Sequence, residues 1–576
     1  MAELGAFTFV LHSHLPYCRE AGRWPHGEEW LHEAAAETYI PLLNALYDLI
    51  AEGIEPKLTL GITPILAEQL ADPLVLEHLV EYLQAKIAAA DAEIERQHTL
   101  KTRRPAEQPG AEQRSPAKAL LARWHRDWYT TILRSFQQRY HGDIIGAFRA
   151  LQDQGMIEIM TSAATHAYLP LASRDSTIFA QIQVAIESYQ RHFGRAPRTI
   201  WLPECAYRPA YIENGLRKPG VEEFLQAQGV RAFFSETFMI EGGAAHTVHG
   251  EAGGIYAGTP RRQLEAWDEP PRRRTTYQPY KVYHSNVAVI GRNRQTGLQV
   301  WSASEGYPGE PLYREFHKKD PVSGLTYWRI TGTHMSLDQK DWYSPKAAFA
   351  KANEHARHFA ELVESLLSDY AQQSGGPGYL ASVYDTELFG HWWFEGVSWL
   401  KQVLRELHWH ADLQLMTTSE CLSAYPPAEA MPLPEGSWGQ GGDHTVWRNE
   451  QTEWLWSLIY RAERQMEEIV AAFPTPSADE AYTLNQIARE LLLLESSDWP
   501  FLITTGQAHE YASQRFKEHL ARFNLLILKL NQSDLAEARR QAELFYTRDN
   551  PFPTIDYRVF AEREGRAGSR YNTASV

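Results

Sequence analysis

The sequence predicts an α/β protein in which a parallel barrel or sheet is followed by an all-α C-terminal domain. From residue 7 to about residue 425, short apolar runs alternate with amphipathic helical stretches, which is the pattern of parallel β/α architectures. Several of the apolar runs stop abruptly at proline, histidine or a carboxylate, as strands do at the carboxyl edge of a barrel, where active sites lie. Beyond residue 426, only helical periodicity remains.

The hydrophobic period, the length of each apolar run and the Gly and Pro residues between runs predict where these elements lie. The expected strands cover residues 7–11, 57–64, 156–160, 200–204, 231–234, 286–290, 298–301, 378–385 and 413–416. The expected helices cover residues 33–49, 74–100, 116–155 with breaks, 176–193, 219–228, 347–367 and 396–407, and then 452–473, 479–494, 508–530 and 533–545. We therefore predict a catalytic barrel at residues 1–425, with a helical insertion at about 75–150, and a helical domain at 426–576.

The first expected strand continues into His12 and His14 and is closed by Pro16. Two residues apart on a strand, the two histidines face the same side, and we interpret them as a binding pair at the mouth of a barrel. A metal ion would need further ligands, so no metal is expected. Spacing alone leaves open that one histidine lies in the core and the other at the surface. The strand at 156–160 ends near His166, another candidate.

Two later strand ends carry carboxylates among aromatic side chains. The run at 200–203 ends in Glu204, and the run at 378–384 ends in Asp385, which Trp392 and Trp393 follow closely. A retaining glycosidase or transglycosidase requires at least two such carboxyl groups. One attacks as an anion, while the other must be protonated, and an apolar pocket raises the pKa of a carboxyl group.

An irregular segment at about residues 242–283 is rich in Gly, Pro and Arg. A loop of this length inside a compact domain is usually functional, and covering an active site is a common use. We interpret this segment as a lid, while a solvated loop with no role is the alternative.

Composition excludes some partners and compartments. The net charge of −16 argues against nucleic acid or an anionic membrane as the main partner. The 18 Trp and 28 Tyr residues fit cores, but Trp in polar Gly-rich loops also suits stacking on neutral sugar rings. The three cysteines without CxxC spacing, an N-terminus without signal character and the lack of any 18-residue apolar run predict a cytoplasmic protein.

With these stretches in view, the chain resembles glycoside hydrolase family 57, and within it the branching enzymes. The resemblance covers nearly the whole chain. It depends on blocks that occur in the family's order: residues 12–16, 61–64, 201–204, 384–393 and the region around 498–499. The Gly- and Trp-rich segment at 437–447 resembles the branching-enzyme subgroup in particular.

The resemblance implies an incomplete (β/α)7 TIM-like barrel whose active-site cleft is completed by the helical C-terminal domain. It implies that Glu204 is the catalytic nucleophile and Asp385 the general acid/base. It also implies a flexible loop with a tyrosine over the site, for which we choose Tyr256 over Tyr277 and Tyr280. The resemblance also places seven residues around the bound glucan: His12, His166, Trp301, Trp438, Trp447, Asp498 and Trp499. His14, from the strand-end pair, and Tyr256 complete the expected substrate-binding set.

The implied reaction cleaves an α-1,4 bond of a glucan through a covalent glycosyl-enzyme and transfers the chain to a 6-hydroxyl, as in glycogen biosynthesis. Amylose or glycogen would be both donor and acceptor, no cofactor is needed, and a monomer or small homo-oligomer is expected. An α-amylase or a 4-α-glucanotransferase on the same scaffold is the nearest alternative. A metal-dependent polysaccharide deacetylase is a more distant one, as is a non-catalytic glucan-binding protein.

Overall fold

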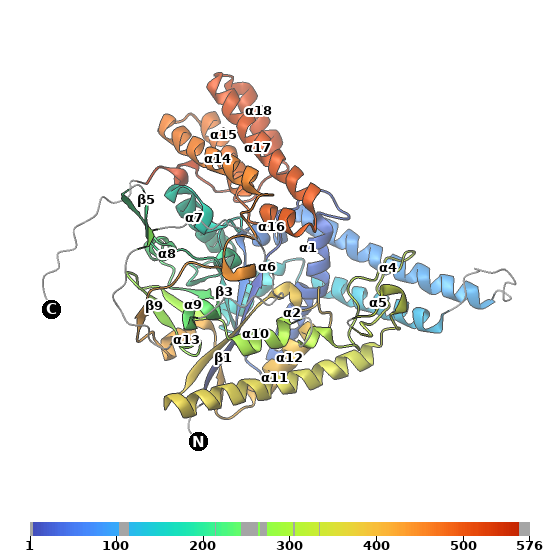
Figure 1. Cartoon of the computed structure of the whole chain (residues 1–576). Coiled ribbons are helices and arrows are strands. Elements are labelled where there is room, and N and C mark those ends of the chain that lie inside the picture. The colour runs from blue at the N-terminus through green and yellow to red at the C-terminus, as the bar shows by residue number, and fades with distance from the viewer. Residues whose placement is uncertain are drawn as a thin grey trace.

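The computed structural model describes residues 4–102, 115–213, 215–242, 263–264, 274–302, 306–332 and 334–563. It shows a mixed α/β protein with a helical C-terminal region (Figure 1). The predicted all-α character of that region is confirmed for the described residues from 453 onward. Within the same described ranges, every helix is too short or too polar to cross a membrane.

The strands lie mostly before residue 432. They are β1 (Gly5–Ser13), β2 (Leu58–Ile62), β3 (Ile157–Met160), β4 (Thr199–Ile200), β5 (Tyr211–Glu213), β6 (Leu216–Lys218), β7 (Ala232–Ser235), β8 (Gln263–Leu264), β9 (Tyr280–Val282), β10 (Ala288–Gly291), β11 (Gly378–Asp385), β12 (Leu413–Leu415) and β13 (Ala430–Met431).

The helices flank these strands and then continue alone. They are α1 (Glu28–Ala34), α2 (Ile40–Ala51), α3 (Pro64–Leu70), α4 (Pro73–Thr102), α5 (Pro116–Arg134), α6 (Ile144–Asp153), α7 (Asp175–Phe193), α8 (Val221–Ala227), α9 (Thr237–Glu241), α10 (Arg294–Trp301), α11 (Pro345–Ser374), α12 (Gly396–His408), α13 (Thr418–Ala424), α14 (Glu453–Ala472), α15 (Ala478–Leu494), α16 (Asp498–Thr505), α17 (His509–Asn531) and α18 (Leu535–Tyr546).

Two sheets form the centre of the molecule. The first has the order β11-β1-β2-β3, with β12 also paired to β1, and all of its pairs are parallel. The second has the order β13-β9-β10-β7-β4, in which β10, β7 and β4 are parallel. Every residue of β1 is buried. Helices cover one side of this parallel sheet and other strands cover its other side, which explains the nearly continuous apolar sequence of β1.

The two sheets are linked at both ends. Thr161, just after β3, forms a parallel bridge with Ile200 of β4. At the other end, the backbone N–H of Asn293, just after β10, donates to the carbonyl of Ala381 in β11 at 3.2 Å. The carboxyl ends of β1, β3, β4 and β11 therefore open toward the same side of the molecule.

In Figure 1, the helical insertion extends to the right of these sheets, and the C-terminal helices lie above them. Helices α4 and α5 pack along each other and extend outward as a hairpin. The C-terminal helices share one apolar core with the α/β part of the chain, in which Tyr168 and Ala180 pack with residues such as Leu491 and Phe516. The C-terminal helices are thus built onto the strand-end face, where the candidate residues lie.

One predicted strand is wrong. Residues 298–301, expected as a strand, form the last turns of helix α10. The Asn293 side chain accepts a hydrogen bond from the N–H of Thr296 and so caps this helix, a signal that outweighs the short apolar run. The structure therefore places Trp301 at the C-terminal end of a helix.

Gly390, in the loop after Asp385, offers a test of how tightly that loop is held. Its φ is +109°, and a Cβ there would lie 1.9 Å from the carbonyl oxygen of Glu37. Gly53 has a φ of +82° with nothing within 4 Å of the same position. We expect Gly390→Ala to lower the free energy of unfolding by more than about 3 kcal/mol, and Gly53→Ala, which meets strain alone, by about 1 kcal/mol. Denaturant unfolding measures both, and equal losses would contradict the close contact.

Candidate active site

Glu204 lies four residues beyond the end of β4, in a short 3-10 turn formed by Pro203–Cys205. Its backbone is left-handed, with φ 59° and ψ 25°, a conformation that a non-glycine residue adopts only when its surroundings hold it there. This backbone turns the side chain out of the strand direction, and 13% of the side chain remains exposed. The apolar run therefore ends by presenting a single carboxyl group at the mouth of the second sheet.

Trp438, which lies before the C-terminal helices, forms hydrogen bonds with Glu204. Its indole N–H donates to Glu204 Oε2 at 2.7 Å, and its backbone N–H donates to the Glu204 carbonyl at 3.1 Å. Burial raises the pKa of Glu204 to about 7, while the indole donor opposes that rise by stabilising the carboxylate. Glu204 is therefore partly ionised at neutral pH, as an attacking carboxylate requires.

Asp385 ends β11 and is paired in register with His12 of β1. Burial raises its pKa well above the usual value, and the carboxyl groups of Glu387 and Glu204 add to the rise. Arg292 opposes it only in part. Since each ionised neighbour disfavours a further negative charge, Asp385 keeps its proton to a higher pH than an ordinary aspartic acid.

The chain segments after β1 and β11 stay side by side beyond the strands. The Ser13 hydroxyl donates to Thr386 at 2.8 Å, and the His14 N–H donates to Glu387 Oε1 at 3.1 Å. The hydroxyl of Tyr39 also donates to this Glu387 oxygen. These contacts fix the loop that carries Asp385.

The three histidines from different strand ends form one cluster. His12 Nε2 and His166 Nε2 lie 3.0 Å apart, and the rings of His14 and His166 stack with centroids 3.8 Å apart. Burial lowers the pKa of both His12 and His166 well below the usual value, so these rings are neutral. The alternative with one histidine in the core and the other at the surface does not match this arrangement, since only 11% of the His14 side chain is exposed and its ring stacks on His166.

The junction between α15 and α16 supplies polar groups from the C-terminal region. Asp498 accepts from His14 Nε2 at 3.0 Å, and the Ser497 hydroxyl lies 2.9 Å from His166 Nδ1 and 3.4 Å from Glu204 Oε1. The sequence did not single out Ser497, Glu387 or Tyr39. Signals for Glu387 and Ser497 were present, because Glu387 belongs to the same strand-end block as Asp385 and Ser497 directly precedes Asp498, but nothing marked Tyr39.

The structure brings together Glu204, Asp385, His12, His14, His166, Trp438 and Asp498. Trp447 and Trp499 are also close to this group in the chain, but each is at most 1% exposed. Trp447 packs on Tyr168, and Trp499 donates to the carbonyl of Leu493, so neither ring presents a face to a ligand. Any effect of these two buried rings on a substrate is therefore indirect.

The remaining expected residues lie elsewhere. Trp301 is partly buried against the core of the first sheet, and its indole N–H is buried without a hydrogen-bond partner among the described residues. Tyr256 and most of the expected lid at 242–283 lie outside the described residues. Of the two competing tyrosines, Tyr280 is fully buried and Tyr277 stacks on Tyr370, so both are occupied by packing.

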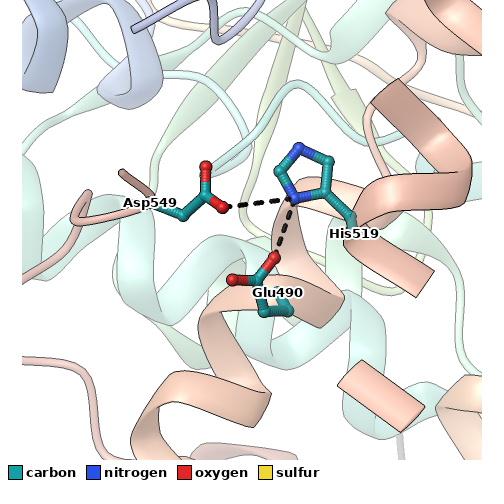
Figure 2. Close-up of side chains that lie close together, drawn as sticks. All are labelled: Glu490, His519 and Asp549. Carbon is teal, nitrogen blue, oxygen red and sulfur yellow. Dashed lines mark hydrogen bonds and ion pairs between the residues drawn. The ribbon is translucent and has the colours of Figure 1, made fainter. Parts of the chain in front are cut away.

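One cluster of side chains able to ligate a metal lies in the described C-terminal region: Glu490 of α15, His519 of α17 and Asp549 after α18, all buried (Figure 2). His519 Nδ1 lies 2.8 Å from Glu490 Oε2, and Arg515 donates to His519 Nε2 at 3.1 Å. With Nε2 accepting, the ring proton is on Nδ1, which is then unavailable to a metal. Arg522 neutralises Asp549 through a bond of 2.5 Å. The cluster therefore fits a buried ion network, and the ring of His519 stacks behind Trp499.

Comparisons with known proteins agree with this geometry. The profile of glycosyl hydrolase family 57 matches residues 8–434, and the profile described as 1,4-alpha-glucan branching enzyme, C-terminal, matches residues 458–560. A 1,4-alpha-glucan branching enzyme of Thermococcus kodakarensis is 44% identical over 563 residues, which cover 96% of this chain and 78% of that protein.

Solved structures give the same result. The structure of the Thermococcus kodakarensis enzyme is 42% identical, with a TM-score of 0.83, covering 98% of this chain and 97% of its own. A branching enzyme of Pyrococcus horikoshii is 38% identical, with a TM-score of 0.83 and 98% of each chain covered. An alpha-amylase of Thermotoga maritima is 30% identical, with a TM-score of 0.80, covering 97% of this chain and 99% of that one.

The raised pKa of Glu204 predicts a gain in stability when its charge is removed. A folded-state pKa of about 7 against an unfolded value of 4.5 means that the folded protein binds the proton more tightly, so stability falls as pH rises from about 4.5 to about 7. We expect Glu204→Gln to raise Tm at about pH 8 and to leave it nearly unchanged at about pH 5. Calorimetry at both pH values measures this. A lower Tm at the higher pH would show that the ionised carboxylate is stabilising.

Proposed function

The chain belongs to glycosyl hydrolase family 57, and from this membership we propose that it is a 1,4-alpha-glucan branching enzyme with α-glucan as both donor and acceptor. The observation that carries the proposal is that the segment matching the branching-enzyme C-terminal profile supplies Ser497 and Asp498 to the carboxyl site. A profile specific to these enzymes therefore coincides with residues that contact Glu204 and the histidine cluster.

We propose that residues 1–425 form an incomplete (β/α)7 barrel and that residues 426–576 form the helical domain that completes the cleft. The bridge from Thr161 to Ile200 and the hydrogen bond from Asn293 to Ala381 support one continuous wall of parallel strands. A cytoplasmic location is part of the proposal, and it is supported by three free cysteines, all buried.

In the proposed mechanism, Glu204 attacks the anomeric carbon and Asp385 protonates the leaving oxygen. The bond from the donor sugar to the leaving 4-oxygen breaks as the bond to Glu204 forms, which gives a covalent glycosyl-enzyme. Asp385, now ionised, takes a proton from the 6-hydroxyl of an acceptor glucan, whose oxygen displaces Glu204. The raised pKa of Asp385 and the indole donor on Glu204 support this division of roles.

The likeness to the Thermotoga maritima alpha-amylase favours hydrolysis as a second candidate function. Water in place of the 6-hydroxyl would then release the chain from the same intermediate. Incubation with amylose separates the two functions. Branching lowers iodine staining and creates linkages that an α-1,6-specific debranching enzyme cuts, whereas hydrolysis raises reducing ends and creates no such linkages.

We expect Glu204→Gln and Asp385→Asn each to lower the rate of branching by at least about 10³-fold with little change in folding. The matched control is Glu158→Gln, which replaces another buried carboxyl group, at the amino-terminal half of β3 beside Thr199 and Ser419. Debranching assays on amylose products measure the rates. Branching within tenfold of the wild type by either catalytic variant would overturn the assignment.

The pH dependence should follow from the two carboxyl groups. We expect kcat/KM to fall below about pH 7 as Glu204 is protonated, and to fall again at higher pH as Asp385, whose pKa is raised by burial, loses its proton. Trp438→Phe removes the indole donor, so the acid limb should move to higher pH, while Trp409→Phe, at an exposed tryptophan after α12, should leave it in place. An unchanged acid limb in Trp438→Phe would contradict the role of this hydrogen bond.

A further inference from the structure

A π-helical segment at Ala35–Tyr39, the π turn, joins α1 to α2, and all of its residues are buried. The N–H of Ile40 donates to the carbonyl of Ala35, five residues earlier, so the π turn holds one residue more than an α-helical turn. A comparable segment at Ser135–Arg139 buries only Phe136. Because π-helical turns inside helices are rare and are frequent at functional sites, the role of the buried π turn should be visible in its contacts.

Two neighbouring hydroxyl groups of the π turn contact the loop that follows Asp385. The Tyr39 hydroxyl donates to Glu387 Oε1, and the Thr38 hydroxyl oxygen accepts from the N–H of His391 at 3.1 Å. Both side chains are buried, at 2% and 0% exposure. The π turn therefore presents a donor and an acceptor, side by side, to the same loop.

A third residue of the π turn, Glu37, holds this loop nearer its other end. Its carbonyl oxygen packs against Gly390, where a Cβ would lie 1.9 Å away. Its carboxylate accepts from both terminal nitrogens of Arg314, at 3.0 and 2.7 Å, and the backbone N–H of Arg314 donates to Glu395 Oε1 at 3.2 Å. Glu395 directly precedes α12, where the loop ends. Contacts of the π turn therefore reach both ends of residues 386–395.

The loop acts on Asp385 through the short 3-10 turn Thr386–Leu388, for which Asp385 is the N-cap residue. In the middle of this turn, Glu387 Oε1 accepts from Tyr39 and also from the His14 N–H at 3.1 Å. The direction of the Asp385 side chain is thus set by β11 on one side and by the position of Glu387 on the other. A displacement of about 1 Å in a catalytic group can cost on the order of 10²-fold in rate, so this position matters for catalysis.

We propose that Tyr39 is a positioning residue for Asp385, and that the π turn exists to hold the hydroxyl groups of Tyr39 and Thr38 against the loop that carries this acid/base. The inference rests on the proposed function, because it assumes the roles of Glu204 and Asp385. Since Tyr39 is buried, it acts through Glu387 and not by touching a glucan. Loss of its hydroxyl should impair proton transfer by Asp385 and leave attack by Glu204 intact.

Two donor substrates separate protonation from attack. When a glucan is cleaved, the bond from the anomeric carbon to the 4-oxygen breaks, and that oxygen takes the proton of Asp385. In maltotriosyl fluoride, the bond to fluorine breaks and fluoride leaves as an anion without a proton, while Glu204 forms the same covalent intermediate. The kcat/KM for fluoride release therefore reports attack by Glu204, whereas the kcat/KM for amylose reports attack together with protonation.

We expect Tyr39→Phe to lower kcat/KM for amylose about tenfold and kcat/KM for fluoride release less than about twofold. Thr38→Val removes the acceptor for His391 and should give the same pattern with a smaller loss. The matched control is Tyr189→Phe in α7, which removes another buried hydroxyl, one that donates to the carbonyl of Ile159, and should leave both rates unchanged. Equal losses with both donors in Tyr39→Phe would overturn the proposal, since the defect would then lie outside protonation.

Hydrogen exchange measured by mass spectrometry tests the hold on the loop without catalysis. The N–H groups of Gly390, Trp392 and Trp393 donate to carbonyls within the loop, so their exchange reports its opening. In Tyr39→Phe, peptides from residues 386–395 should exchange about tenfold faster than in the wild type, and in Tyr189→Phe they should be unchanged. Unaltered exchange in Tyr39→Phe would show that the hydroxyl does not hold the loop, which would also overturn the proposal.

These failures differ from failure of the proposed function. If the wild-type protein forms no α-1,6 linkage from amylose but raises its reducing ends, branching is wrong, and the two donors are then compared through hydrolysis. If the wild type acts on neither donor, the proposed function is wrong, while hydrogen exchange still reports whether Tyr39 holds the loop. If branches form and Tyr39→Phe loses equally on both donors, only the inference about Tyr39 is wrong.

Discussion

The in-register pairing of β1 with β11 is the contact on which the site depends. It places His12 opposite Asp385, and the same register continues into the contacts of Ser13 with Thr386 and of His14 with Glu387. A slip of one residue would turn every side chain of one strand to the other face of the sheet and would separate these partners. All nine residues of β1 are buried, including the polar His12 and Ser13, so a shifted strand would leave these buried groups without their partners His166 and Thr386.

The C-terminal helices convert this strand-end face into an enclosed site. Trp438 approaches Glu204 before the helices begin, and Ser497 and Asp498 approach from the α15–α16 junction. Enclosure excludes water from groups that must carry charge, which is why the pKa values of both Glu204 and Asp385 are raised. The burial that raises the pKa values of these carboxyl groups therefore also means that their ionisation destabilises the fold.

Much of the α/β part follows from local sequence, because an apolar run that stops at Glu204 or Asp385 marks both a strand and the edge at which the candidate site lies. The contacts of Ser497 with Glu204 and His166 could not be predicted, since they join residues about three hundred positions apart and leave no local pattern. Trp447 shows a related limit. A tryptophan in a Gly-rich segment suits either a binding face or a buried wedge, and only the packed structure places it against Tyr168.

Glu204 and His166 share a backbone feature: both are non-glycine residues with positive φ, 59° and 57°, at strand ends. Such a conformation costs on the order of 1–2 kcal/mol that glycine would avoid. Glycine would adopt this backbone without that cost, but it would also remove the Glu204 carboxyl group and the buried His166 ring. At both positions, the conformation that would favour glycine is therefore kept together with a side chain that glycine lacks.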